Sequence, residues 1–209
     1  MIETFKLPLF DEDRQIRIYV PENYHSSSIN YPVLYMHDGQ NVFLEEDAIG
    51  GVSLEIHRYL EDNHINLIVV AIDLNITGEE RINEYCPWTN GEYSKKLLGY
   101  QSTSGGKGAH YVDFIVDQLK PMIDKKYRTL PNETYMAGIS LGALISTYAM
   151  CCYPQIFKRI AAISAAYYRN QEEIERLLRS SDLSKVERFY LDCGTRESGA
   201  NDVISTAFL

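Results

Sequence analysis

The sequence has no apolar run that approaches the roughly 20 residues of a membrane-spanning helix. Its start, Met1–Lys6, also lacks the basic region followed by an apolar one that marks a secretory signal. These absences argue against a membrane protein and favour a cytoplasmic one. A mature chain whose signal peptide has been removed fits the same residues.

Cysteine is scarce, and basic residues are outnumbered. The four cysteines (Cys86, Cys151, Cys152 and Cys193) have no spacing typical of a zinc site, and two of them are adjacent in a helical pattern. We therefore expect reduced, mostly buried thiols, no metal and no organic cofactor. The 20 basic and 29 acidic residues give a net charge of −9, which argues against binding nucleic acid or an anionic membrane surface.

Short apolar runs of β type alternate with helical patterns, which predicts an α/β fold: a mostly parallel central sheet with helices on both faces. The first two runs, Thr4–Phe10 and Gln15–Val20, are expected to pair antiparallel around a turn at Asp11–Arg14. Five more strands are expected at Pro32–His37, Leu67–Asp73, Thr134–Ile139, Arg159–Ser164 and Arg188–Cys193. A length of 209 residues suits a single domain over residues 1–209.

Several helical patterns supplement these strands. Apolar stripes are formed by Val52, Ile56, Tyr59 and Leu60, and by Tyr111, Phe114, Ile115, Leu119, Met122 and Ile123, with a kink expected at Pro121. Asn170 with Glu173 has the spacing of a capping box at the start of a further helix. A last helical pattern follows Asn201 and has no stop signal before Leu209, so we expect a C-terminally truncated chain.

The motif with the clearest chemistry is Gly138-Ile139-Ser140-Leu141-Gly142. An apolar strand pattern precedes it, and an apolar helix pattern from Leu141 to Tyr153 follows. Gly-x-Ser-x-Gly between a strand and a helix is the nucleophile elbow, in which small residues let the strand and helix approach closely. Ser140 is therefore the predicted nucleophile, held where helix amides favour developing negative charge.

A serine nucleophile needs a histidine base and an acid that orients it. The acid is expected after the second strand beyond the elbow, which favours Glu197 and leaves Asp192, inside that strand, as the alternative. The five histidines (His25, His37, His57, His64 and His110) all precede Ser140, and His57 and His64 are expected on the solvated surface. His110 begins a helix but breaks the usual order of serine, acid and histidine. The base is therefore expected beyond Leu209, with the final strand and helix.

Two further segments are candidates for the site. His37-Asp38-Gly39-Gln40-Asn41 follows a strand at the place that supplies one oxyanion-hole amide, so we assign the amides of Gln40 and Leu141 to this role. His37 and Asp38 are expected to hold this loop beside the substrate. Trp88 follows the Leu67–Asp73 strand in a loop and fits either a wall of the substrate pocket or a buried loop anchor.

These motifs occur together in one order along nearly the whole chain. The pieces are Tyr31–Phe43; Arg81, Glu84, Tyr85, Pro87 and Trp88; Leu119–Asp124 with Tyr127–Thr129; Ala137–Ala143; Tyr153, Pro154 and Phe157; and Leu191–Glu197. In this arrangement the chain resembles the putative esterase family of α/β-hydrolases, which includes enterochelin esterases, esterase D and some feruloyl esterase domains. The resemblance implies Ser140 as nucleophile and Glu197 as acid. The family's histidine, in a Gly-His or Gly-x-His segment near the C-terminus, has no counterpart here.

The leading hypothesis is a serine carboxylic ester hydrolase that acts through an acyl-enzyme on a small-molecule ester. An acyltransferase with the same intermediate is the alternative among enzymes, and a non-catalytic binding module on a hydrolase scaffold is the alternative outside them. Siderophore lactones, acylated sugars, feruloyl or acetyl esters and small thioesters all suit the resemblance. A homo-oligomer is compatible with the sequence, which carries no sign of subunit number.

Overall fold

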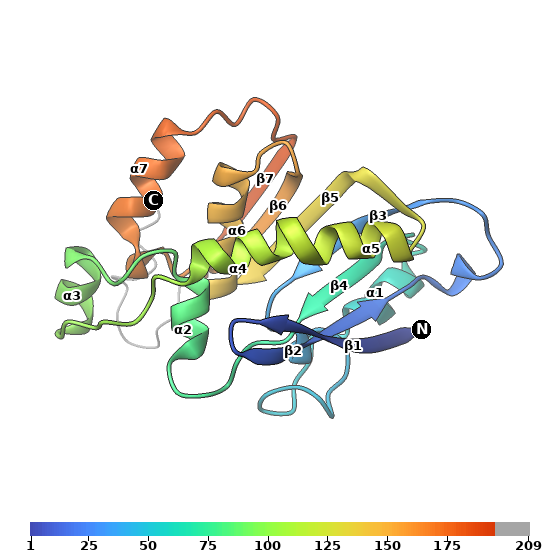
Figure 1. Cartoon of the computed structure of the whole chain (residues 1–209), viewed down its shortest axis with the longest axis horizontal. Coiled ribbons are helices and arrows are strands. Elements are labelled where there is room, and N and C mark those ends of the chain that lie inside the picture. The colour runs from blue at the N-terminus through green and yellow to red at the C-terminus, as the bar shows by residue number, and fades with distance from the viewer. Residues whose placement is uncertain (195–209) are drawn as a thin grey trace. The chain divides into compact units, whose positions relative to one another are not determined.

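The computed structural model describes residues 1–194 (Figure 1). Its strands are β1 (Ile2–Leu9), β2 (Glu12–Tyr19), β3 (Tyr31–Met36), β4 (Ile68–Ile72), β5 (Thr129–Ile139), β6 (Phe157–Ile163) and β7 (Arg188–Asp192). Its α-helices are α1 (Ile56–Asp62), α2 (Glu80–Tyr85), α3 (Glu92–Leu98), α4 (Gly108–Phe114), α5 (Lys120–Lys126), α6 (Leu141–Cys152) and α7 (Gln171–Ser180). The strand order β1-β2-β4-β3-β5-β6-β7 belongs to an α/β fold.

The chain divides into two compact units. Among the described residues, the first contains Met1–Asn75 and Asp113–Met136, and the second contains Ile76–Val112 and Ala137–Gly194. Strands β1 to β4 belong to the first unit, β6 and β7 belong to the second, and β5 passes from one to the other.

In the first unit, β1 pairs antiparallel with β2 from Ile2 opposite Tyr19 to Leu9 opposite Glu12. The pairing was predicted, but the predicted turn at 11–14 is wrong, because only Phe10 and Asp11 lie between the last paired residues. β2 is antiparallel to β4, and β3 is parallel to β4. The carboxyl ends of β3 and β4 therefore lie side by side.

The core of the first unit forms around β4, in which all five residues are buried. This agrees with the absence of alternation in its sequence, since a strand covered on both faces has no polar side. Tyr19, Tyr31 and Tyr35 are among the largest fully buried side chains. In the second unit, β6 and β7 are parallel, with Ile163 opposite Asp192.

One predicted helix differs from the expectation, and a second is irregular where a kink was predicted. α1 begins at Ile56, so Val52 lies outside it and is 74% exposed, and Tyr59 is 58% exposed. Between α4 and α5, residues Ile115–Leu119 form a π-helix just before Pro121. Proline has no N–H and its ring crowds the carbonyl four residues earlier, so the helix is irregular where a kink was predicted.

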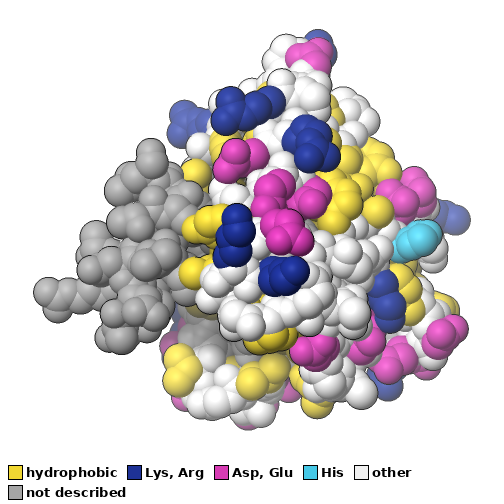
Figure 2. Space-filling model, turned by 90° about the vertical axis from the view of Figure 1, so that its left-hand side faces the viewer, with side chains coloured by type: hydrophobic (Ala, Val, Ile, Leu, Met, Phe, Trp, Pro, Cys, Tyr) yellow, Lys and Arg dark blue, Asp and Glu magenta, His cyan; other side chains and the backbone are white. Residues whose placement is uncertain are grey.

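The surface carries charged side chains of both signs. On the face in Figure 2, acidic and basic side chains of the described residues are interspersed. No helix within residues 1–194 is long and apolar enough to cross a membrane.

The four cysteines are free, and burial raises the pKa of Cys86 to about 12 and that of Cys151 to about 11. Cys152, by contrast, is exposed.

His57 is half-buried, which corrects the expectation of a solvated surface position. Its ring centroid lies 6.2 Å from that of Tyr19 and 6.0 Å from that of Phe43. Its Nδ1 atom is buried without a hydrogen-bond partner. Burial lowers the pKa of His57 because it disfavours the charged ring; Arg58 adds to this effect and Glu61 opposes it.

This lowered pKa predicts a loss of stability in mild acid. The unfolded chain takes up a proton at His57 near its ordinary pKa of about 6.5, whereas the folded protein resists protonation until a lower pH. The free energy of unfolding should therefore be highest above about pH 6.5 and fall as the pH drops through the lowered pKa. The free energy of unfolding of the His57→Phe variant should fall less over the same pH range. Urea unfolding of both proteins at about pH 7.5 and about pH 5 measures this, and equal falls would contradict it.

Candidate active site

Ser140 forms the turn between β5 and α6 in the second unit. It has φ 60° and ψ −117°, a backbone conformation that residues with a side chain rarely adopt. β5 ends at Ile139 and α6 begins at Leu141, so the serine alone makes the change of direction. Such strain persists only where the surrounding structure enforces it, and it is typical of functional positions. We call Gly138–Gly142 the Ser140 turn.

Gly138 is required by the closeness of strand and helix in this turn. A Cβ atom placed on it would lie 2.1 Å from the carbonyl oxygen of Gly142 and 2.8 Å from the amide nitrogen of Ala143. Both neighbours are main-chain atoms, which cannot move aside as a side chain can. The sequence therefore needs glycine here for packing, as the motif predicted.

Main-chain hydrogen bonds hold the Ser140 turn from several sides. The Ser140 amide donates to the carbonyl of Ile163 at 3.0 Å, and the Ser140 carbonyl accepts from the amide of Ala166 at 3.0 Å. The same carbonyl accepts from the amides of Ala143 and Leu144 at the start of α6. Because these are the first bonds of the helix, the amides of Leu141 and Gly142 have no acceptor within it. An anion near the Ser140 side chain would therefore meet a helix N-terminus.

Asp192 ends β7 and is already engaged on both carboxylate oxygens. Oδ1 accepts from the amide of Ser164 at 3.1 Å, and Oδ2 accepts from the hydroxyl of Tyr190 at 2.8 Å. The hydrogen bond to this carboxylate raises the pKa of Tyr190. These contacts are those of a group that joins the ends of β6 and β7. Glu197, the favoured acid, lies outside the described residues.

The predicted oxyanion loop, His37–Asn41, lies in the first unit directly after β3. His37 is 4% exposed, and Asp38 has φ 55° at the start of a short 3₁₀ helix, Gly39–Asn41. The first bond of this helix runs from the Asn41 amide to the Asp38 carbonyl, at 2.8 Å. The amides of Gly39 and Gln40 therefore have no acceptor within the turn, which is the condition for a free oxyanion donor.

Trp88 is half-buried, in the loop after α2 in the second unit. Its ring packs edge-on against Tyr148 of α6, with centroids 5.4 Å apart. The side chain of Asn170 donates to the carbonyls of Trp88 and Thr89 at 3.0 and 3.2 Å. This corrects the predicted capping box, because Asn170 precedes α7 without making a side-chain cap. The sequence pattern missed this role, since the partners lie about eighty positions away along the chain.

The other histidines lie on the surface. His25, His64 and His110 are exposed, which confirms the expectation for His64. His110, the histidine of the second unit, lies on α4. Within the described residues, no three His, Cys, Asp or Glu side chains form a group that could hold a metal ion.

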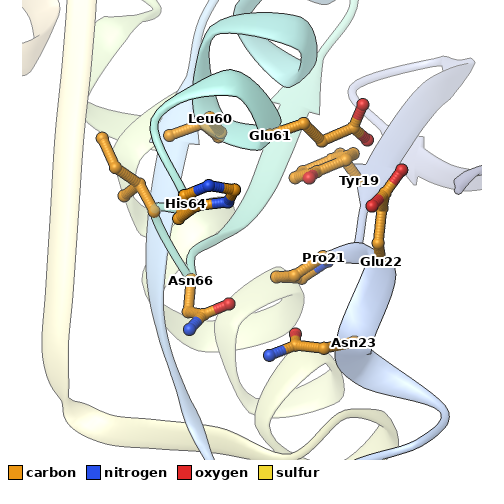
Figure 3. Close-up of a pocket in the computed structure, with 9 residues that line it drawn as sticks. Tyr19, Pro21, Glu22, Asn23, Leu60, Glu61, His64 and Asn66 are labelled. Atoms are coloured by element: carbon orange, nitrogen blue, oxygen red, sulfur yellow. The ribbon is translucent and has the colours of Figure 1, made fainter.

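A separate hollow of about 200 Å³ lies in the first unit (Figure 3). Glu22, Glu61 and Tyr19 lie on one side of it, and His64 and Asn66 on the other. Burial raises the pKa of Tyr19, and so do the charge of Glu61 and the hydrogen bond donated to it. Asn66 precedes β4, so the hollow is at the amino end of that strand. The His37–Asn41 loop is at the opposite, carboxyl end, where α/β sheets bind ligands, so we do not assign the hollow to the substrate.

Comparison with known sequences identifies relatives. A family model described as "Putative esterase" matches residues 8–209. The uncharacterized protein YbbA of Bacillus subtilis (strain 168) is 29% identical over 188 residues, which cover 88% of this chain and 69% of that protein.

Solved structures show the same fold. The siderophore hydrolase EstA from Aspergillus nidulans has a TM-score of 0.77 at 20% identity, over 96% of this chain and 71% of that one. An IroE-like serine hydrolase from Shewanella oneidensis has a TM-score of 0.67 at 22% identity, over 86% of this chain and 54% of that one. The enterobactin esterase FES from Shigella flexneri, in the presence of enterobactin, has a TM-score of 0.73 at 16% identity, over 99% of this chain and 48% of that one. The chain thus has the predicted α/β-hydrolase fold and spans about half the length of the last two.

Proposed function

Because the chain belongs to the Putative esterase family, we propose that it is a serine carboxylic ester hydrolase with Ser140 as nucleophile. The single observation that carries the proposal is the Ser140 turn. A non-glycine residue is held at φ 60° between a strand and a buried helix, and Gly138 allows their close approach. This is the strand–turn–helix context that distinguishes a nucleophile elbow from an ordinary serine in a loop.

In the proposed reaction the Ser140 hydroxyl attacks the ester carbonyl and gives its proton to a histidine. The carbonyl oxygen becomes an oxyanion, the alcohol leaves with a proton from that histidine, and water then releases the acyl group. We propose the amides of Leu141 and Gln40 as oxyanion donors. Each is at the first turn of its helix, where amides have no acceptor within the helix.

We propose Glu197 as the acid that orients the histidine, with the histidine after it in the chain order usual for these hydrolases. The contacts of Asp192 support this choice, because its two oxygens accept from Ser164 and Tyr190 and so give it a structural role at the ends of β6 and β7. Glu197→Gln should therefore reduce kcat far more than Asp192→Asn. We propose a small-molecule ester as substrate, with Trp88, His37 and Asp38 as its neighbours.

A fluorophosphonate probe tests the nucleophile directly. We expect the purified natural protein to gain the mass of one adduct, and peptide mapping should locate it on Ser140. The same protein should hydrolyse p-nitrophenyl acetate or butyrate. An adduct on another residue, or none under conditions that label a known serine esterase, would contradict the proposal. Transfer of the acyl group to an added alcohol in preference to water would identify an acyltransferase.

A further inference from the structure

The side chain of Gln40 makes two hydrogen bonds to the main chain of Leu74, just beyond β4. It accepts one of them and donates the other. Its Oε1 accepts from the amide of Leu74 at 2.9 Å, and its Nε2 donates to the carbonyl of Leu74 at 3.4 Å. Gln40 is 8% exposed, so water competes little for these bonds. A primary amide is the side-chain group that pairs with one residue's N–H and C=O at once.

Asp73, the residue before Leu74, packs directly against the turn that carries Gln40. A Cβ atom on Gly39 would lie 2.6 Å from Oδ1 of Asp73 and 2.8 Å from its amide nitrogen. The register of the parallel pair leads to this contact, because Met36 is opposite Ala71 and both strands end within one residue of that point. The turn that carries Gln40 is therefore seated against the end of β4.

The position of Asp73 is in turn fixed by a paired charge from β2. Arg17 donates through Nε to Oδ1 of Asp73 at 2.7 Å and through Nη2 to Oδ2 at 3.0 Å. Its Nη1 donates to Asp47 at 2.6 Å. The Arg17 and Asp73 side chains are 8% and 15% exposed. Burial alone would lower the pKa of Arg17, but its bonds to the two carboxylates outweigh this and raise it.

Such a buried ion pair adds little net stability, because desolvation offsets much of the attraction. Its fixed bidentate geometry is better suited to defining a position. An oxyanion donor needs that precision, since a displacement near 1 Å costs about a hundredfold in rate.

We infer that Gln40, Asp73 and Arg17 form a polar clamp that sets the main-chain amide of Gln40 as an oxyanion donor. The side chain of Gln40 is a positioning group, distinct from its own amide. This inference rests on the proposed function, because only in an ester hydrolase does the Gln40 amide act as an oxyanion donor. It assigns roles to Asp73 and Arg17, which lie outside every motif of the sequence.

Gln40→Met tests the clamp, because methionine has a similar length and volume but makes neither bond to Leu74. We expect kcat for p-nitrophenyl butyrate to fall about 10- to 100-fold with KM within about twofold. Thr134→Val is the matched control. Thr134 is also buried, and its hydroxyl donates to the main-chain carbonyl of Pro131 at 3.1 Å, a hydrogen bond that valine cannot make. It should keep the parental kcat while losing comparable stability in urea.

Gln40→Glu gives a second readout that folding defects do not imitate. At neutral pH the carboxylate keeps the acceptor for the Leu74 amide but repels the Leu74 carbonyl. When protonated it donates to that carbonyl again, so its kcat relative to the parent should rise as the pH falls, and it should do so well above the ordinary glutamate pKa of about 4.3 because burial raises the pKa of this carboxyl. Parental kcat in Gln40→Met, or a ratio of one at every pH in Gln40→Glu, would overturn the clamp alone. A parent without Ser140-dependent hydrolysis would overturn the proposed function and the clamp with it.

Discussion

Replacing Ser140 by alanine is expected to lower kcat for ester hydrolysis by about 10⁴-fold or more and to abolish labelling by a fluorophosphonate. Without the hydroxyl no acyl-enzyme forms, and what remains is the stabilisation that the amides give to attack by water. The Ser140 side chain is half-buried and accepts none of the main-chain bonds that hold the turn, so its removal should leave the turn in place. Circular dichroism and urea unfolding should match the parent.

Ser146→Ala is the matched control for this prediction. Ser146 lies in the same helix, α6, is fully buried, and donates to the carbonyl of Gly142 at 2.7 Å. Its loss removes a hydrogen bond of the helix and should cost about 1 kcal/mol of stability without changing kcat more than about twofold. If Ser140→Ala retained parental hydrolysis, another residue would be the nucleophile and the proposed mechanism would be wrong.

Most of the strands could be predicted because their signals are local, although β5 begins at Thr129, five residues before its predicted start at Thr134. Ile68–Ile72 is buried on both faces and shows it by an unbroken apolar run, and β6 and β7 end within one residue of expectation. The Ser140 turn was predictable for a similar reason. Gly138 and Gly142 are two residues from the serine, so a segment of five residues contains the small side chains that the turn requires.

Features that depend on distant partners could not be predicted. Gln40 and Leu74 are separated by 34 positions, and Arg17 and Asp73 by 56, so no local pattern reveals their bonds. Asn170 fits a capping box by spacing, yet its side chain binds carbonyls of another loop. A local preference for a cap is worth about 1 kcal/mol, which a buried partner can outweigh.

The second large effect is expected from Gly138→Ala. In this variant the new methyl group would overlap the main chain of α6, 2.1 Å from the carbonyl oxygen of Gly142. Overpacking by one or two methyl groups usually costs about 1–3 kcal/mol, because side chains can shift, whereas here only backbone is available to move. We expect a loss of about 3 kcal/mol or more, together with loss of activity, because opening the turn displaces Ser140 and the Leu141 amide. Urea unfolding and kcat on the same preparation measure both.

Gly50→Ala separates this overlap from the general cost of replacing glycine. Gly50 has φ 81°, but a Cβ atom there would meet nothing within 4 Å. Alanine should therefore cost only the strain of a left-handed conformation, about 1–2 kcal/mol, and leave kcat unchanged. If Gly138→Ala were no more destabilising than Gly50→Ala and kept the parental kcat, strand and helix would not meet as closely as the structure shows. The elbow would then lose the packing argument on which the assignment of Ser140 depends.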